Sequence, residues 1–219
     1  MDAVDCPAGV ITAGGTSARL GLDKASLRMR PGGPDLLVRT ATLLKDIIGN
    51  VLIVGREHPD FPWIPDDRPN LGPAGGATSA LRRCGRACLV LPCDMPFIDA
   101  PTLRRLLAAR TQRPADSVLT AFSNGAGVVH TALPGIYEPG ALPFLQQGLL
   151  AGQAALARLI PQNLVHRVTC APEDALPLFT VNYPADLALA LAFIRAQSGR
   201  AGAGTRRAAV RTRRAGRAV

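Results

Sequence analysis

The chain has 219 residues, of which 47% are hydrophobic and 19% are charged, which is enough for one buried core and excludes wholesale disorder. No apolar run approaches the ~20 residues of a membrane-spanning helix. The net charge of +9 is unevenly spread, because the segment from Arg200 onward has seven arginines and no acid, whereas residues 1–199 have 18 basic and 16 acidic side chains. A nearly balanced body with a basic tail does not favour a nucleic-acid groove, so we expect neither nucleic acid nor a membrane as partner.

The first half of the chain alternates between short apolar runs and helical patterns. Each run is apolar on both faces and is bounded by turn residues, as in a parallel sheet covered by helices. The expected strands are Gly9–Ala13, Asn50–Gly55 and Ala87–Cys93, and the expected helices between them are Leu36–Ile48 and Ala74–Cys84. This order predicts right-handed βαβ units, and therefore a three-layer, Rossmann-like α/β fold with a mostly parallel central sheet.

The second half continues the pattern more loosely. We expect one folded domain over residues 1–197 and a disordered basic tail over residues 198–219, where Gly, Ala, Thr and Arg show no apolar periodicity. The remaining expected elements are a helix at Pro101–Arg110, strands at Ser117–Phe122 and Gly127–Leu133 around the turn Asn124-Gly125, helices at Pro139–Gln147 and Gly152–Ile160, a strand at Leu164–Cys170 and a last helix at Pro184–Gln197.

Two features of the sequence indicate a reducing compartment. Asp2 and Asp5 stand where a signal peptide would carry positive charge, so we expect a cytoplasmic protein. The cysteines are odd in number and form no C-x-x-C pair, which argues against a disulfide framework and against a zinc site. We expect free thiols that serve mainly as small hydrophobic side chains. They are Cys6, Cys84, Cys88, Cys93 and Cys170.

Three expected strand ends carry residues that packing does not explain well. They are Gly14–Lys24 after the first strand, Asp66–Gly76 before the second long helix, and Cys93–Phe97 after the third strand. Because α/β domains bind ligands at the carboxyl ends of their strands, we expect these segments to meet at one site.

The segment from Ala13 to Lys24, called the Gly-rich loop below, has the composition of a phosphate-binding loop. It holds three glycines, two hydroxyl side chains, Arg19 and one of the only two lysines of the chain. Glycines let backbone N–H groups approach an anion, and Arg and Lys add positive charge. Neither the P-loop pattern nor G-x-G-x-x-G fits, so on these residues alone a plain Gly-rich connection stays the alternative.

Four ordered motifs go further than this composition. A-G-G-x-S-x-R-x-G-x-D-K over residues 13–24, D-x-x-P-x-x-G-P-x-G-G over 66–76, L-P-C-D-M-P-F over 91–97 and V-N-Y-P-A-D-L over 181–187 together resemble the molybdenum cofactor guanylyltransferases, a family of nucleotidyltransferases. Three positions depart from the family pattern. Leu20 stands in place of the more frequent Met, Thr180 stands where the family often has a second Asn, and Ala185 replaces an acid.

The resemblance implies transfer of GMP from GTP to the terminal phosphate of molybdopterin, with or without its metal, and release of pyrophosphate. It implies GTP and molybdopterin as partners and leaves molybdoenzyme maturation proteins open as further ones. Such a transfer needs in-line positioning and neutralisation of triphosphate charge rather than covalent help from the protein.

The resemblance also implies roles for particular residues. Lys24 and Arg19 are expected to act on the triphosphate, and Asp94 to hold Mg²⁺. The residues themselves support Asp94, because a carboxylate at the end of an apolar strand is costly unless it is paired or coordinating; a helix cap before Pro96 is the alternative. The expected substrate-binding residues are Ala13, Gly14, Gly15, Lys24, Asp66, Asp94 and Asn182.

Two other functions remain open at this point. One is a sister nucleotidyltransferase that uses CTP or another phosphorylated acceptor, such as a sugar phosphate. The other is a non-catalytic nucleotide-binding module that acts on nucleic acid through its tail. For the base, Ala13-Gly14-Gly15 is similar to the guanine-using relatives, whereas the cytosine-using ones look like A-A-G. The physical interpretation is that Gly14, without a Cβ, lets the backbone approach a purine.

Overall fold

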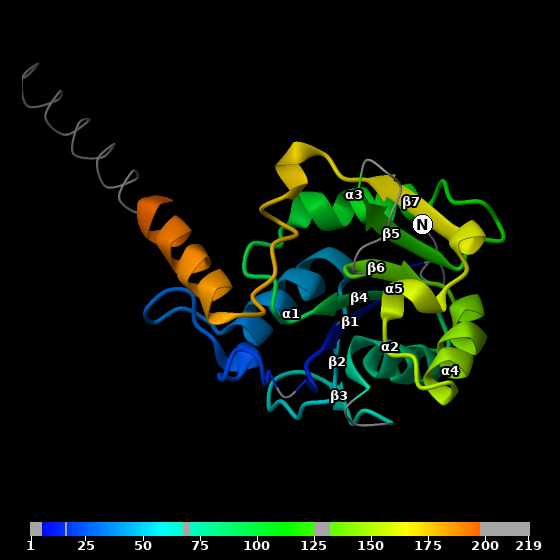
Figure 1. Ribbon diagram of the computed structural model, residues 1–219, viewed down its shortest axis with the longest axis horizontal. Coiled ribbons are helices and arrows are strands. Elements are labelled where there is room, and N and C mark those ends of the chain that lie inside the picture. The colour runs from blue at the N-terminus through cyan, green and yellow to red at the C-terminus, as the bar shows by residue number, and fades with distance from the viewer. Residues whose placement is uncertain (1–5, 16, 68–70, 125–131, 198–219) are drawn as a thin grey trace, which may run out of the picture.

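The computed structural model describes residues 6–15, 17–67, 71–124 and 132–197. Within these ranges seven strands form one sheet in the order β3-β2-β1-β4-β6-β5-β7 (Figure 1). The strands are β1 (Ala8–Thr12), β2 (Leu52–Val54), β3 (Trp63–Ile64), β4 (Cys88–Pro92), β5 (Leu119–Ser123), β6 (Gly135–Tyr137) and β7 (Val165–Thr169).

Strand directions bring several chain segments to one edge of this sheet. β1 pairs in parallel with β2 and β4, and β2 pairs in parallel with β3, whereas β6 runs antiparallel between β4 and β5. The sheet is therefore mostly parallel. The carboxyl ends of β1, β2, β3 and β4 lie along the same edge, which is where the segments singled out in the sequence leave the sheet.

Helices cover both faces of the sheet, and the predicted three-layer α/β fold is confirmed. The α-helices are α1 (Leu36–Ile48), α2 (Gly72–Cys84), α3 (Ala100–Arg110), α4 (Leu142–Leu150) and α5 (Leu156–Leu159), and residues 184–197 are also helical. Short 3-10 turns are η1 (Lys24–Ser26), η2 (Pro139–Ala141), η3 (Gln162–Leu164) and η4 (Pro172–Asp174). None of the helices in the described ranges is long and apolar enough to cross a bilayer.

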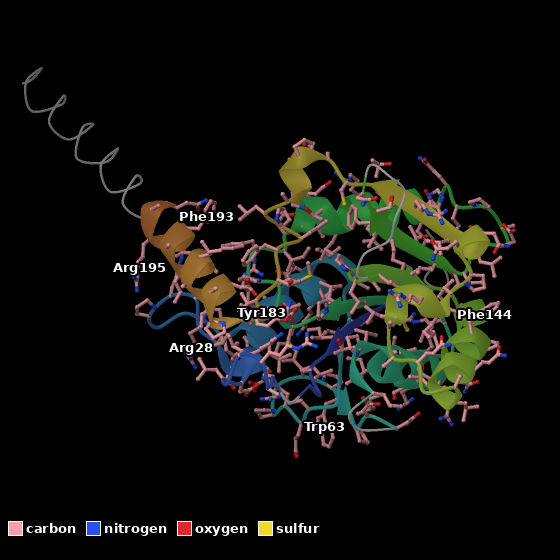
Figure 2. All side chains as sticks on the ribbon, in the orientation of Figure 1. Arg28, Trp63, Phe144, Tyr183, Phe193 and Arg195 are labelled. Carbon is pink, nitrogen blue, oxygen red and sulfur yellow. The ribbon has the colours of Figure 1, made fainter. Side chains whose placement is uncertain are left out.

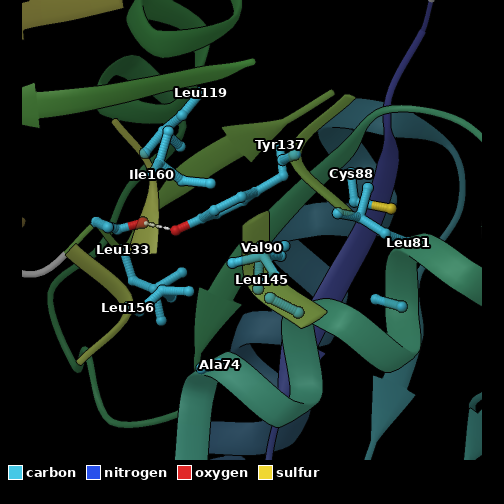
Figure 3. Close-up of a cluster of buried hydrophobic side chains, with 14 of the residues drawn as sticks. Ala74, Leu81, Cys88, Val90, Leu119, Leu133, Tyr137, Leu145, Leu156 and Ile160 are labelled. Atoms are coloured by element: carbon cyan, nitrogen blue, oxygen red, sulfur yellow. Dashed lines mark hydrogen bonds between the residues drawn. The ribbon is translucent and has the colours of Figure 1, made fainter. Parts of the chain in front are cut away.

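Successive side chains of the central strands point to opposite faces of the sheet and belong to two separate hydrophobic cores. Val10 and Val90 belong to the core under α2 and α4, while Ile11 and Leu91 belong to the core under α1 and α3. Figure 3 shows the first core, where the fully buried Tyr137 donates its hydroxyl to the carbonyl of Ala132 at 2.9 Å. A strand that is buried on both faces has to be apolar throughout, which is why the sequence shows continuous apolar runs.

Helix α1 has the bounds that the sequence predicts because both of its ends carry capping residues. The Asp35 carboxylate accepts the N–H of Val38 at 2.8 Å, and Gly49 closes the helix with a left-handed φ of 84°. Gly85 closes α2 in the same way, with φ 62°. Gly85 therefore separates Cys84, the last residue of α2, from Cys88, the first residue of β4.

A third, smaller cluster joins the C-terminal helical segment to the Gly-rich loop. Leu20, Val181 and Ala190 are buried together, with Leu27 and Leu187 packed against them. In Figure 1 this helical segment is orange and lies beside the blue chain between β1 and α1. In Figure 2 the label of Tyr183 lies near its start and that of Phe193 near its far end. The last motif of the sequence is thereby brought next to the first.

Some predicted elements were wrong or missed. The strand expected at Gly127–Leu133 was wrong at its described end, because residues 132 and 133 are not in a strand and the strand is β6; residues 125–131 lie outside the described ranges. Gly135 has weak strand propensity, so sequence pattern favoured the wrong segment. The helix expected over Gly152–Ile160 is helical only in α5, and the two-residue β3, which carries Trp63 (Figure 2), was missed. Residues 1–5 and the expected basic tail lie outside the described ranges.

Candidate functional site

A cleft with a volume of about 470 Å³ lies at the carboxyl ends of β1 and β4. All eight residues expected in the substrate site line it, from four separate parts of the chain. They are Ala13, Gly14, Gly15, Arg19, Lys24, Asp66, Asp94 and Asn182. Their placement together is a structural finding, whereas the role of each in binding or catalysis stays a prediction.

Lys24 is held between two acceptors from distant parts of the chain. Its ammonium donates to Oδ2 of Asp94 at 2.9 Å and to Oδ1 of Asn182 at 2.7 Å. The side chains of Lys24 and Asp94 are each only 15% exposed, so solvent screens this ion pair less than it screens a surface pair. Oδ1 of Asp94 is buried and has no hydrogen-bond partner among the described residues. An unpaired buried carboxylate oxygen is costly, which points to a ligand at this place.

The Gly-rich loop is braced just before Lys24. The Asp23 carboxylate accepts both guanidinium arms of Arg56 at 2.7 and 2.8 Å, and it also accepts the N–H of Ala25 and the hydroxyl of Ser26. Burial acts to raise the pKa of Asp23, but the hydrogen bonds from Ser26 and Arg56, with the Arg56 charge, outweigh it and hold that pKa below its ordinary value. Asp23 thus stays ionised and fixes the turn η1, which begins at Lys24.

The two glycines that open the loop have different surroundings. A Cβ at Gly14 would meet the backbone of Gly55, with the Gly55 Cα at 3.1 Å, whereas a Cβ at Gly15 would meet nothing within 4 Å. Gly55 itself has φ 86° and the same close contact from its side. The sequence-based explanation of Gly14 therefore needs correction: the space that a Cβ would take there is filled by the protein backbone and not left to a base. Gly15 is the glycine whose Cβ position is open.

Asp66 packs on the first turns of α2. Its Oδ1 accepts the hydroxyl of Ser79 at 3.1 Å, and a Cβ at Gly75 would lie 3.2 Å from both carboxylate oxygens. A Cβ at Gly76 would meet Cγ2 of Thr12 at 2.6 Å. The glycine pair thus lets α2 lie directly on the end of β1 and on Asp66. Asp66 also borders a second cavity of about 280 Å³ between α2 and α4.

Comparison with known proteins agrees with this arrangement. A family model described as the MobA-like NTP transferase domain matches residues 9–181. The chain belongs to this family. A probable molybdenum cofactor guanylyltransferase of Chloroflexus aggregans is 33% identical over 202 residues, which are 85% of this chain and 94% of that protein. A protein of the same description from Pelotomaculum thermopropionicum is 30% identical over 207 residues, which are 89% of this chain and 95% of the relative.

Solved structures show the same fold for this MobA-like transferase. The molybdopterin-guanine dinucleotide biosynthesis protein A of Archaeoglobus fulgidus matches with a TM-score of 0.69 at 20% identity, covering 85% of this chain and 98% of that one. A 2-C-methyl-D-erythritol 4-phosphate cytidylyltransferase of Thermus thermophilus matches with a TM-score of 0.58 at 19% identity, covering 85% and 98%. The resemblance drawn from the four motifs is confirmed, and the chain is a nucleotidyltransferase of the MobA-like family.

Sequence reasoning missed several contacts of this MobA-like site besides those of Lys24. Examples are the brace from Arg56 to Asp23, the backbone contact of Gly55 with Gly14, and the hydrogen bond from Asn182 to Thr180. Gly55 and Arg56 directly follow β2, so their position at the end of a strand could have pointed to them. Arg19, expected near the phosphates, is exposed at the rim of the cleft.

Proposed function

We propose that this nucleotidyltransferase transfers GMP from GTP to the terminal phosphate of molybdopterin and releases pyrophosphate. The observation that carries the proposal is the Lys24–Asp94–Asn182 group in the cleft, with an unpaired carboxylate oxygen beside a lysine ammonium. The descriptions of two relatives as molybdenum cofactor guanylyltransferases support the choice of substrates. We expect the reaction to take place in the cytoplasm.

The reaction exchanges one phosphoanhydride bond for another. An oxygen of the molybdopterin phosphate forms a bond to the α-phosphorus of GTP, and the bond from the α-phosphorus to the bridging oxygen breaks. The electron pair leaves with pyrophosphate. Because the nucleophile is already an anion, the protein has to align the two reactants and stabilise the negative charge. Lys24 supplies positive charge, and the open face of Gly15 leaves room for phosphate oxygens next to the backbone.

The residues present fit a Mg²⁺ ion bound together with the substrate. Mg²⁺ usually takes one or two protein carboxylates and completes its shell with phosphate oxygens and water. Oδ1 of Asp94 is buried and unpaired, and Asp66 lines the same cleft. Within the described ranges no group of three His, Cys, Asp or Glu side chains is placed to hold a metal. When bound, Mg²⁺ would supply a Lewis acid for the phosphate oxygens; Asp94 is the residue that would hold it.

The test is release of pyrophosphate with purified molybdopterin and each of the four nucleoside triphosphates in Mg²⁺. We expect GTP to support transfer at least ~10-fold better than CTP, the scale of one lost buried hydrogen bond. A preference for CTP would overturn the guanine assignment and favour the sister activity. No pyrophosphate from any nucleotide would overturn the proposed function as a whole.

A further inference from the structure

The short segment 180–182 is docked on the backbone of Asp94. The N–H of Val181 donates to the Asp94 carbonyl at 2.9 Å, and the Val181 side chain is fully buried in the cluster with Leu20 and Ala190. Thr180 and Asn182 flank this anchor, one on each side. The Asn182 side chain therefore lines the cleft from a fixed stretch of backbone, and the Thr180 side chain lies next to it.

The amide of Asn182 makes two directional contacts. Its Oδ1 accepts from Lys24 at 2.7 Å, and its Nδ2 donates to the hydroxyl oxygen of Thr180 at 3.0 Å. An ammonium can only donate, so the amide oxygen has to face Lys24 and the amide nitrogen has to find an acceptor elsewhere. Thr180 is that acceptor. The backbone N–H groups of Asn182 and Tyr183 are satisfied separately by Oδ2 of Asp186, at 2.9 and 2.8 Å.

These contacts also orient the ammonium of Lys24. Of its three N–H groups, one points to Asp94 and one to Asn182. Among the described residues no further acceptor of Lys24 is found, and Lys24 lines the cleft. The third N–H is therefore available to a ligand with acceptor oxygens, such as a phosphate, and its direction is set by the other two.

We propose that Thr180 is a positioning residue of this site: its hydroxyl fixes the amide of Asn182, and through that amide it aims the Lys24 ammonium at a nucleoside triphosphate. The inference rests on the proposed function only in taking a triphosphate as the ligand. The contacts run from Thr180 to Asn182, from Asn182 to Lys24 and from Lys24 to Asp94. A hydroxyl that does not itself line the cleft therefore helps to set the direction of the Lys24 N–H groups. Such preorganisation lowers the reorganisation needed when the ligand arrives.

The first experiment replaces the hydroxyl with a methyl group of similar size. Thr180→Val should weaken binding of GTP, measured by calorimetry without acceptor, about three- to tenfold, the range expected for one lost hydrogen bond. Thr180→Ser keeps the acceptor and should restore most of the affinity. Thr169→Val, an exposed threonine of β7, is the matched control and should bind like the parent. Equal binding by Thr180→Val and the parent would overturn the inference.

The second experiment separates positioning from a general structural role. If Thr180 acts through Asn182, Thr180→Val should cost nothing further in an Asn182→Ala background, because the amide that it holds is gone. The same loss in both backgrounds would overturn the inference. Thermal unfolding of all variants excludes a folding defect as the cause of a loss. Because the readout is nucleotide binding, run with CTP as well as GTP, its result is distinct from a failure of transfer to molybdopterin.

Discussion

The ammonium of Lys24 lies 2.9 Å from one carboxylate oxygen of Asp94, while the other oxygen of that carboxylate is buried without a partner in the described part of the chain. One residue thus meets a fixed positive charge on one side and presents an unsatisfied acceptor on the other. The Oδ1 atom of this carboxylate can therefore still accept a hydrogen bond or bind a cation. A cation that arrives with a triphosphate would satisfy it, and Lys24 would share the phosphate charge.

Asp94→Asn is expected to reduce pyrophosphate release by a factor of ~10² or more while the protein stays folded. The amide is of the same size but lacks the negative charge that would hold Mg²⁺ and that pairs with Lys24. Circular dichroism and thermal unfolding provide the control for folding. Near-normal turnover of the folded variant would contradict the assignment of Asp94 to the metal.

Lys24→Ala is expected to lose about 2–4 kcal/mol of transition-state stabilisation, the scale of one preorganised donor, measured from kcat/KM for GTP. Lys24→Arg should restore little, because a terminal guanidinium nitrogen has only two N–H groups, which Asp94 and Asn182 would both take, whereas the ammonium at 2.9 and 2.7 Å from these acceptors keeps a third for a phosphate. Parent-like turnover by both variants would show that no charge at this position is required.

The edge of the sheet that carries the site could be predicted because its causes are local. Continuous apolar runs indicate buried parallel strands, and parallel strands place their carboxyl ends together. For that reason the loop after β1 and Asp94 after β4 were expected at one site, where the structure has them. Capping residues such as Asp35 and Gly49 set the ends of α1 in the same local way.

The contacts within the site could not be predicted in this way. Asn182 follows Lys24 by 158 positions, and only the docking of residues 180–182 on Asp94 brings the two side chains to 2.7 Å. No spacing in the sequence carries that information. The environment of Gly14 is a similar case, because the nearness of Gly55 depends on the pairing of β1 with β2 and on a left-handed backbone at Gly55.

Cys84 is expected to be the most reactive of the described thiols near neutral pH. A hydrogen bond from the Cys88 thiol lowers the pKa of Cys84 to about 7 against the opposing effect of burial, and the charges of Arg86 and Arg83 add to the lowering. The reactive thiolate therefore forms as the pH rises through about 7. Burial together with the Asp94 charge raises the pKa of Cys93 to about 12, which keeps it protonated.

The measurement for Cys84 is the rate of iodoacetamide labelling from pH 5.5 to 9, followed at each cysteine by peptide mass spectrometry. The rate at Cys84 should reach half its maximum near pH 7. Cys88→Ala removes the hydrogen-bond donor and should move that midpoint to higher pH. A midpoint near the ordinary thiol value in the parent protein would contradict the proposed environment of Cys84.

Two neighbouring glycines of the loop should respond differently to the same added methyl group. Gly14→Ala places its Cβ 3.1 Å from the Gly55 Cα and 3.3 Å from the Gly55 carbonyl oxygen, so backbone has to move. We expect a loss of about 1–3 kcal/mol in unfolding free energy, seen as a melting temperature lower by several degrees.

Gly15→Ala meets nothing within 4 Å and should melt like the parent, but its methyl group enters the cleft and should weaken GTP binding ~10-fold. Thermal unfolding without ligand and calorimetric titration with GTP, applied to both variants, give the comparison. Loss of stability at position 15, or a parent-like melting temperature at position 14, would contradict the assignment of Gly14 to backbone packing and of Gly15 to the ligand.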